Sequence, residues 1–286
     1  MREHEAPIEL TDDAGHVVRL DAPARRVVSL IPGRTDAILA LGAADRLVAR
    51  TRFDTDPRLA GLPSMENALT PSVEWLVAQQ PDLIVAWPDE QARSVVSRLI
   101  EIGIPVYSSR VQTIADVERA VSDLGTLLGL DAAADSVLAA MQSELAAVRA
   151  AVASSERKTV LYLVGIEPAM AAGPETFIDE IITIAGGTNL FGDAGAMWPM
   201  ISVEEVVRRS PDIIVVSVGE LASADVLERM RVLPGWRSLS AVRESRVHTV
   251  PADSFNRPGP AVARSARRLG ALFHPQAFPR DGAGKP

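Results

Sequence analysis

Two segments of the chain share one pattern: a short capped helix, a Pro-Asp dipeptide and an apolar strand. Residues 72–77 precede 81–85 in the first half, and residues 202–207 precede 211–215 in the second. Both helices open on Ser, a preferred N-cap residue. A continuous apolar run bounded by turn residues is typical of a strand buried on both faces. The repeat therefore predicts two lobes of similar build.

The rest of the chain alternates between strand-like and helix-like segments. Apolar runs typical of strands lie at 26–30, 47–50, 83–86, 105–107, 159–164, 213–216 and 247–250. Helical patterns separate them, among them 71–78, 90–102, 177–184, 202–209 and 260–273. This alternation predicts mostly parallel sheets with helices on both faces. We also expect a hairpin at 8–20, and a turn at 31–34 before a helix at 35–41.

The middle of the chain is almost entirely helix-forming. Between residues 132 and 153, apolar side chains recur at helical spacing, at Val137, Met141, Leu145 and Val148. A helix of about 22 residues spans about 33 Å, which is too long for one strand-to-strand crossover. We therefore expect an α/β protein with an N-terminal lobe at 1–128, a connecting backbone helix at 129–156 and a C-terminal lobe at 157–286.

Composition excludes several classes of function. The balance of 29 basic and 37 acidic residues gives a net charge of −8, which argues against nucleic acid as a partner. Cys is absent. No two of the four His residues are spaced as metal ligands are, so we expect no metal site. No catalytic motif is present either. Residues 1–7 lack the apolar core of a secretory signal, so the sequence is either cytosolic or a mature chain.

Two of the four tryptophans lie at positions suited to a ligand. Trp87 ends the apolar run at 83–86, and ligands of open α/β sheets bind outside the carboxyl ends of strands. Trp198 lies in a loop just before a helix that opens at Ser202. Packing in the core or at its rim explains both positions equally well from the pattern alone.

The chain resembles the substrate-binding proteins of ABC importers for metal chelates, and among them the cobalamin-binding members. The resemblance runs from about Arg26 to His274. The segments that carry it are 26–30, 41–47, 80–87, 185–191, 198–202 and 251–257. Two positions depart from the cobalamin-binding pattern, because Ala68 and Ser254 stand where it has aromatic residues.

The resemblance implies two α/β lobes joined by one long helix, the class III architecture, with the ligand captured between them. Cobalamin or a related corrinoid would be the transported ligand and not an intrinsic cofactor. A corrin is a broad, amide-fringed macrocycle, so it requires aromatic contact and a few polar groups. The ligand-binding set that the resemblance implies is Phe53, Trp87, Met170, Trp198, Asp253, Phe255 and Arg257.

The resemblance also implies a partner and a location. Glu74 and Glu204 occupy equivalent positions of the repeat and would dock on basic residues of a dimeric permease. Stabilisation of the helix N-terminus by their charge is a compatible second role. We expect a monomer that acts in the periplasm or outside the cytoplasmic membrane, with the export signal or lipid anchor absent from this sequence.

Three alternatives stay open. A ferric siderophore receptor would use cationic side chains, for which Arg34, Arg52 and Arg257 are candidates. A haem receptor would need a Tyr or His ligand, but Tyr107 and Tyr162 fall in or beside strands. A corrinoid-binding protein outside transport, or a cofactor-binding enzyme subunit of similar fold, is the third.

Overall fold

The structure, a computed structural model, describes residues 7–68, 71–88, 90–218 and 223–278. The chain divides into two compact units. Unit 1 comprises residues 1–111 and 115–139, and unit 2 comprises residues 112–114 and 140–286. Within the described residues, no helix is long and apolar enough to cross a membrane.

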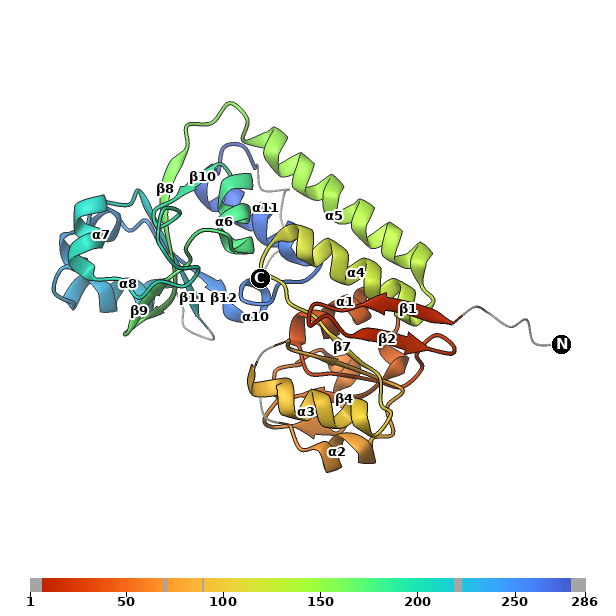
Figure 1. Cartoon of the computed structure of the whole chain (residues 1–286). Coiled ribbons are helices and arrows are strands. Elements are labelled where there is room, and N and C mark those ends of the chain that lie inside the picture. The colour runs from red at the N-terminus through yellow and green to blue at the C-terminus, as the bar shows by residue number, and fades with distance from the viewer. Residues whose placement is uncertain (1–6, 69–70, 89, 219–222, 279–286) are drawn as a thin grey trace. The chain divides into compact units, whose positions relative to one another are not determined.

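Unit 1 is built on a parallel sheet with the strand order β5-β4-β3-β6-β7 (Figure 1). Its strands are β3 (Val27–Ser29), β4 (Leu47–Thr51), β5 (Ser64–Met65), β6 (Leu83–Ala86) and β7 (Val106–Ser108). The expected hairpin forms as the antiparallel pair β1 (Ile8–Thr11) and β2 (Val17–Leu20). The helices that follow these strands are α1 (Pro32–Ala40), α2 (Val73–Ala78) and α3 (Glu90–Glu101), with short 3₁₀ turns at Ala44–Arg46 and Pro57–Leu59.

Unit 2 repeats this plan with the parallel order β10-β8-β11-β12, and β9 pairs antiparallel with β8. Its strands are β8 (Lys158–Ile166), β9 (Ala169–Ala171), β10 (Gly187–Asn189), β11 (Ile213–Val218) and β12 (Val247–Pro251). Its helices are α6 (Phe177–Ile184), α7 (Val203–Arg209), α8 (Ser223–Val232), α9 (Ser240–Arg243), α10 (Ala252–Phe255) and α11 (Val262–Phe273), with a 3₁₀ turn at Trp236–Ser238. The α/β class with mostly parallel sheets is confirmed.

Two long helices lie between the sheets in sequence, α4 (Ile114–Leu128) and α5 (Asp131–Ala151). The second matches the helix expected at 132–153. The boundary between the units falls at residues 139 and 140, inside α5, so each unit contains part of this helix.

The internal repeat is visible in backbone detail. Ser72 and Ser202 cap α2 and α7 in the same way, each Oγ accepting a backbone N–H three residues later at 3.2 Å. Each helix is followed by a residue in the left-handed region, Gln80 with φ 51° and Ser210 with φ 50°. This conformation reverses the chain sharply so that it enters the next strand. The two segments therefore have the same local fold as well as the same sequence pattern.

An aspartate at the same position of each repeat fixes the sheet. Asp82 accepts the backbone N–H groups of Arg25 and Arg26, both at 2.8 Å. Asp212 accepts the backbone N–H and the hydroxyl of Thr159, also at 2.8 Å. Each carboxylate thus ties the start of β6 or β11 to the neighbouring strand, and so fixes how the two strands align at their amino ends.

The structure differs from the sequence-based expectation at α1. We expected a turn at 31–34 and a helix from Thr35, but the helix begins at Pro32. Proline suits the first turn of a helix, because the N–H that it lacks has no intrahelical partner there. Strands β5, β9 and β10 were not expected. They are two or three residues long, too short for a periodic signal.

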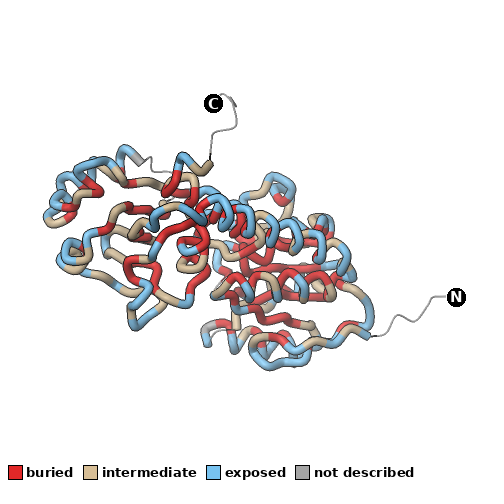
Figure 2. Tube along the Cα trace, turned by 90° about the horizontal axis from the view of Figure 1, so that it is seen from above, coloured by how far each residue is buried: buried red, intermediate tan, exposed pale blue. Residues whose placement is uncertain are grey.

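Both sheets are enclosed by apolar packing, and in Figure 2 the buried residues run through their strands. Leu83, Ile84 and Val85 of β6 are fully buried, as are Ile214, Val215 and Val216 of β11. A strand buried on both faces must end where the helical layers end. Its carboxyl end is therefore the first point at which the chain can present side chains to a ligand.

Replacing Asp212 with Ala should destabilise the protein by about 1–2 kcal/mol, because the backbone N–H and the hydroxyl of Thr159 both lose the carboxylate oxygen that accepts their hydrogen bonds. Burial raises the pKa of the Asp212 carboxyl. The hydrogen bonds from Thr159 lower this pKa by more than burial raises it, so the net pKa is below the ordinary value of 3.8. A lowered pKa means that this stabilisation is present at neutral pH and is lost as the pH falls through the folded-state value. Urea unfolding at pH 7 and below pH 3 measures both effects.

Asp135→Ala, which removes an exposed carboxylate of α5, is the matched control and should change stability by less than about 0.5 kcal/mol. Equal destabilisation by the two substitutions would contradict the role of Asp212.

Candidate functional site

In unit 1, the predicted aromatic residues lie at the carboxyl ends of two parallel strands. Trp87 directly follows β6, is half-buried, and packs partly against the core of the unit. Phe53 lies two residues after β4 and is 46% exposed, with the guanidinium of Arg52 4.6 Å from its ring centre. Because the strands are parallel, both residues lie at the same edge of the sheet. Unit 1 therefore presents aromatic surface where ligands of such sheets bind.

Trp87 also lines a pocket of about 360 Å³ inside unit 1. The turn between β1 and β2, the first turns of α3 and the end of β7 form its other walls. Asp12, at that turn, accepts the backbone N–H of Ser108, and the N–H of Asp13 donates to the Ser108 carbonyl. These bonds hold the hairpin against β7. The pocket is therefore a fixed part of unit 1.

In unit 2, Trp198 lies on a two-stranded ribbon. Residues 197–201 run antiparallel to β9, with N–H to carbonyl bonds from Ala171 to Pro199 (3.0 Å) and from Gly173 to Met197 (2.8 Å). Met170 pairs directly with Met200. Side chains of directly opposed residues share a face, as do side chains two residues apart on one strand. Trp198, Met170 and Met200 therefore share one face of the ribbon.

That face is accessible to a ligand. Trp198 is 40% exposed and Met200 is 63% exposed, which is high for large apolar side chains. β9 pairs with Leu163, Gly165 and Ile166, the carboxyl half of β8, so the ribbon lies at the carboxyl edge of its sheet. The structure thus brings Met170 and Trp198 together and adds Met200, which is not in the predicted ligand-binding set.

A third group follows the carboxyl end of β12. Asp253 and Arg257 form an ion pair of 2.9 Å, in which the side chain of Arg257 is mostly buried and that of Asp253 is mostly exposed. Between them, Asn256 accepts the hydroxyl of Ser217 at 2.9 Å and that of Tyr162 at 3.4 Å. These bonds anchor the α10 segment to β11 and β8. Asn256 positions the ion pair, a role that we did not predict.

Phe255 differs from the other residues of the predicted set. Its side chain is 1% exposed, so its ring packs in the interior of unit 2. The geometry of α10 explains this burial. Asp253 and Phe255 lie on different sides of a single helical turn, and only the side with Asp253 is accessible. We leave Phe255 out of the site proposed below.

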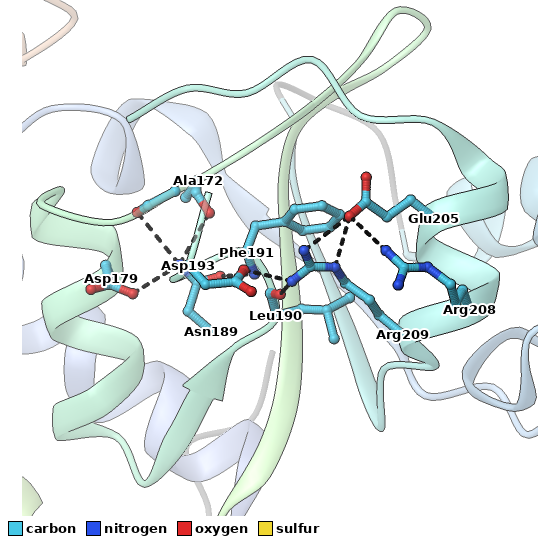
Figure 3. A network of polar contacts seen from close by, with 10 residues as sticks. Ala172, Asp179, Asn189, Leu190, Phe191, Asp193, Glu205, Arg208 and Arg209 are labelled. Carbon is cyan, nitrogen blue, oxygen red and sulfur yellow. Dashed lines mark hydrogen bonds and ion pairs between the residues drawn. The ribbon is translucent and has the colours of Figure 1, made fainter. Parts of the chain in front are cut away.

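A polar network holds the end of β9 and the loop that leads into residues 197–201 (Figure 3). The side-chain amide of Asn189 donates to Asp179 (2.8 Å) and to the Ala172 carbonyl (3.1 Å), which joins β10 to α6 and to the end of β9. Arg209 of α7 donates to Asp193 (2.6 Å) and to the Leu190 carbonyl (2.8 Å). Asn189 was present in a segment that we recognised, but nothing in the sequence showed its contacts.

Glu74 and Glu204 are both exposed and lie in the first turns of α2 and α7. The hydroxyl of Ser72 donates to Glu74 at 2.8 Å. This bond and one from the backbone N–H of Glu74 lower the pKa of its carboxyl, with the backbone bond the larger cause. Glu204 makes no hydrogen bond or ion pair with any residue that the structure describes. Both carboxylates are accessible to a partner.

The structure places three of the candidates for other ligands, Tyr107, Tyr162 and Arg34, in the interior. Tyr107 donates to Asp123 at 2.7 Å, and burial raises the pKa of both tyrosines. Arg34 is fully buried and donates to the Ser109 hydroxyl at 3.0 Å, and burial lowers its pKa to about 10. Among the described residues, no cluster of three or more His, Asp or Glu could hold a metal ion.

Gly173→Ala should distort the ribbon, because a Cβ there would lie 2.2 Å from the Ala196 carbonyl oxygen. A backbone oxygen cannot rotate away, so we expect a destabilisation of about 1–3 kcal/mol and a shifted Trp198 fluorescence spectrum. Gly195→Ala is the matched control in the same loop, since a Cβ there meets nothing within 4 Å. Thermal unfolding and emission spectra identical for both variants would show that Gly173 does not set the ribbon.

Comparison with known proteins assigns the chain to a family. A family model of periplasmic binding proteins matches residues 27–254. The chain is 32% identical over 281 residues to a cobalamin-binding protein of Halobacterium salinarum, covering 94% of this chain and 74% of that protein.

Two solved structures are similar over most of their length. One is the periplasmic vitamin B12 binding protein of Vibrio cholerae, with 25% identity, a TM-score of 0.75 and coverage of 89% of this chain and 98% of that one. The other is an ABC-type Fe³⁺-hydroxamate transport system from Saccharomonospora viridis, with 25% identity, a TM-score of 0.78 and coverage of 94% and 100%. With its repeated α/β units and its family match over most of its length, the chain belongs to the periplasmic binding proteins, a family of binding proteins and not of enzymes.

Proposed function

We propose that this protein captures cobalamin or a related corrinoid outside the cytoplasmic membrane and delivers it to an ABC importer. The observation that carries the proposal is the placement of Trp87 and Trp198. Each lies at the carboxyl edge of a parallel sheet, in a different unit, and Trp198 is well exposed. Relatives named for binding cobalamin or vitamin B12 support the same ligand class.

The chemistry of these surfaces suits a corrin. Aromatic rings and methionine side chains provide broad, adaptable apolar contact for a flat macrocycle. The amide groups at its rim need hydrogen-bonding partners, and the Asp253–Arg257 pair offers an acceptor and a donor together. The proposed ligand-contacting set is Phe53, Trp87, Met170, Trp198, Asp253 and Arg257. Cobalamin is the cargo in this proposal.

A ferric siderophore is the second candidate, because the hydroxamate transport relative has the same fold. Arg52 is exposed to an anionic chelate, whereas Arg257 is mostly buried and paired with Asp253, and Arg34 is fully buried. Haem is disfavoured, because Tyr107 and Tyr162 are buried and their hydroxyls are already bonded. The site therefore offers a siderophore few cations and offers haem iron no tyrosine ligand.

Delivery would use Glu74 and Glu204. They are repeat-equivalent, exposed, and displayed by helices that open in the same way, so each unit presents one carboxylate in a matching local frame. A permease dimer with two equivalent basic surfaces would be a complementary partner. In this proposal the protein acts as a monomer.

Replacing Trp87 and Trp198 together with Ala should weaken cyanocobalamin binding by a hundredfold or more. Central aromatic contacts contribute about 2 kcal/mol each when truncated, and 1.4 kcal/mol corresponds to a tenfold change. Isothermal titration calorimetry measures the affinity, and circular dichroism checks that the variant is folded. The Trp→Phe double variant keeps a ring at each position and should recover much of the affinity. A folded Ala variant with unchanged affinity would exclude these residues from the site.

Charge reversal by Glu74→Lys and Glu204→Lys should leave ligand affinity unchanged and abolish transport. The physical reason is repulsion from a basic docking surface in place of attraction. Uptake of radiolabelled cyanocobalamin into cells or proteoliposomes that contain the cognate importer is the readout. The matched control is Glu101→Lys with Glu228→Lys, which reverses one exposed helical Glu in each unit. Normal uptake by the first variant, or equal loss in both, would contradict docking through Glu74 and Glu204.

A further inference from the structure

The pocket beside Trp87 combines an aromatic wall with cationic groups. Five of its lining residues carry the argument: Asp13, Trp87, Arg93, Ser108 and Arg110. They come from the β1–β2 turn, the segment after β6, α3 and the end of β7 (Figure 1). Its volume of about 360 Å³ exceeds what a single small anion requires.

The two arginines are available for an anion. The guanidinium of Arg110 makes no ion pair or hydrogen bond with the residues that the structure describes; only its backbone N–H is used, donating to Asp13 at 2.6 Å. Arg93 pairs with Glu90 at 3.3 Å, but the two side chains are 71% and 85% exposed. Such exposed pairs contribute little to stability and exchange easily for a better partner.

The acidic residue of the pocket does not neutralise them. The carboxylate of Asp13 accepts the Arg110 backbone N–H through one oxygen and the guanidinium of Arg119 at 3.0 Å through the other. Arg119 also pairs with Asp116 at 2.9 Å, outside the pocket lining. Asp13 is therefore engaged with groups other than the Arg93 and Arg110 side chains, so both guanidinium groups keep N–H donors for an anion.

A second observation also points to a polar ligand. Ser108 is fully buried, and its hydroxyl has no hydrogen-bond partner among the described residues. A buried hydroxyl without a partner is costly, so such groups in native proteins are commonly satisfied by water or a ligand. Because Ser108 lines the pocket, its hydroxyl can donate to an anion bound there.

We propose that this pocket binds the phosphodiester of a corrinoid's nucleotide loop. Arg93 and Arg110 hold the phosphate, and Trp87 packs against the nucleotide base attached to it. The inference rests on the proposed function and specifies its ligand. Arginine side chains bind phosphate through charge-assisted hydrogen bonds, and aromatic rings provide stacking surface for bases. The pocket thereby makes the protein selective for complete cobalamins over corrinoids that lack the loop.

The test compares cyanocobalamin with dicyanocobinamide, which has the corrin ring but no phosphodiester or nucleotide base. Calorimetric affinities are measured for the unsubstituted protein, for Arg93→Gln with Arg110→Gln, and for Arg98→Gln with Arg268→Gln. The last variant removes two exposed charges outside the pocket lining and serves as the control. A titration of the unsubstituted protein with cyanocobalamin in added inorganic phosphate tests whether the pocket accepts free phosphate.

We expect the pocket variant to lose tenfold or more of its cyanocobalamin affinity while its dicyanocobinamide affinity changes less than twofold. The control should bind both ligands as the unsubstituted protein does. Competition by millimolar phosphate against cyanocobalamin alone would also support the assignment.

Equal losses for the two ligands, or none, would overturn the phosphodiester assignment while leaving corrinoid capture intact. Failure of the unsubstituted protein to bind either corrinoid would instead overturn the proposed function, and this inference with it.

Discussion

The parallel order of the strands is the constraint on which the rest of the structure depends. Parallel strands place all their carboxyl ends at one edge of a sheet, so residues distant in sequence meet there. Asp82 and Asp212 fix the opposite edge, because each ties the start of a central strand to its neighbour. Trp87 lies at the carboxyl edge of the sheet in unit 1. The Asp253–Arg257 pair comes just after the carboxyl end of β12 in unit 2.

The position of Trp198 depends on a different kind of contact. Its ribbon exists because Gly173 lets two backbones approach closely, with the Ala196 carbonyl lying where a side chain would otherwise be. Asn189 and Arg209 then fix the loop that leads into it. The exposed indole is therefore held by main-chain bonds and by a network of polar side chains. This arrangement limits the conformational entropy that binding must overcome, which is how preorganisation raises affinity.

The two units share a local fold because they contain the same local sequence signals. Serine caps, left-handed residues at 80 and 210, and Pro-Asp dipeptides recur at the same spacing. These signals are local, so the sequence alone predicted the repeat, the central strands, the long helix and the placement of Trp87. The equivalence of Glu74 and Glu204 follows from the same register, and the structure gives both an exposed first-turn position.

What the sequence did not predict is long-range. The β9 ribbon, the Asn189 contacts and the pocket beside Trp87 join residues tens of positions apart, and no periodicity records such pairings. Phe255 shows a related limit: its neighbours are polar, so its burial depends on which side of one helical turn faces the core. Pro32 shows that a residue typical of turns also opens helices, and only packing distinguishes the two.

The most direct test of corrinoid capture is a tryptophan-fluorescence titration of the unsubstituted protein with cyanocobalamin, a ferric hydroxamate and haemin in parallel. Free tryptophan amide titrated alongside corrects for light absorbed by the ligands. The account predicts saturable quenching by cyanocobalamin alone, because Trp87 and Trp198 lie at the proposed contact surfaces. Saturable quenching by the ferric hydroxamate or haemin, with none by cyanocobalamin, would contradict it.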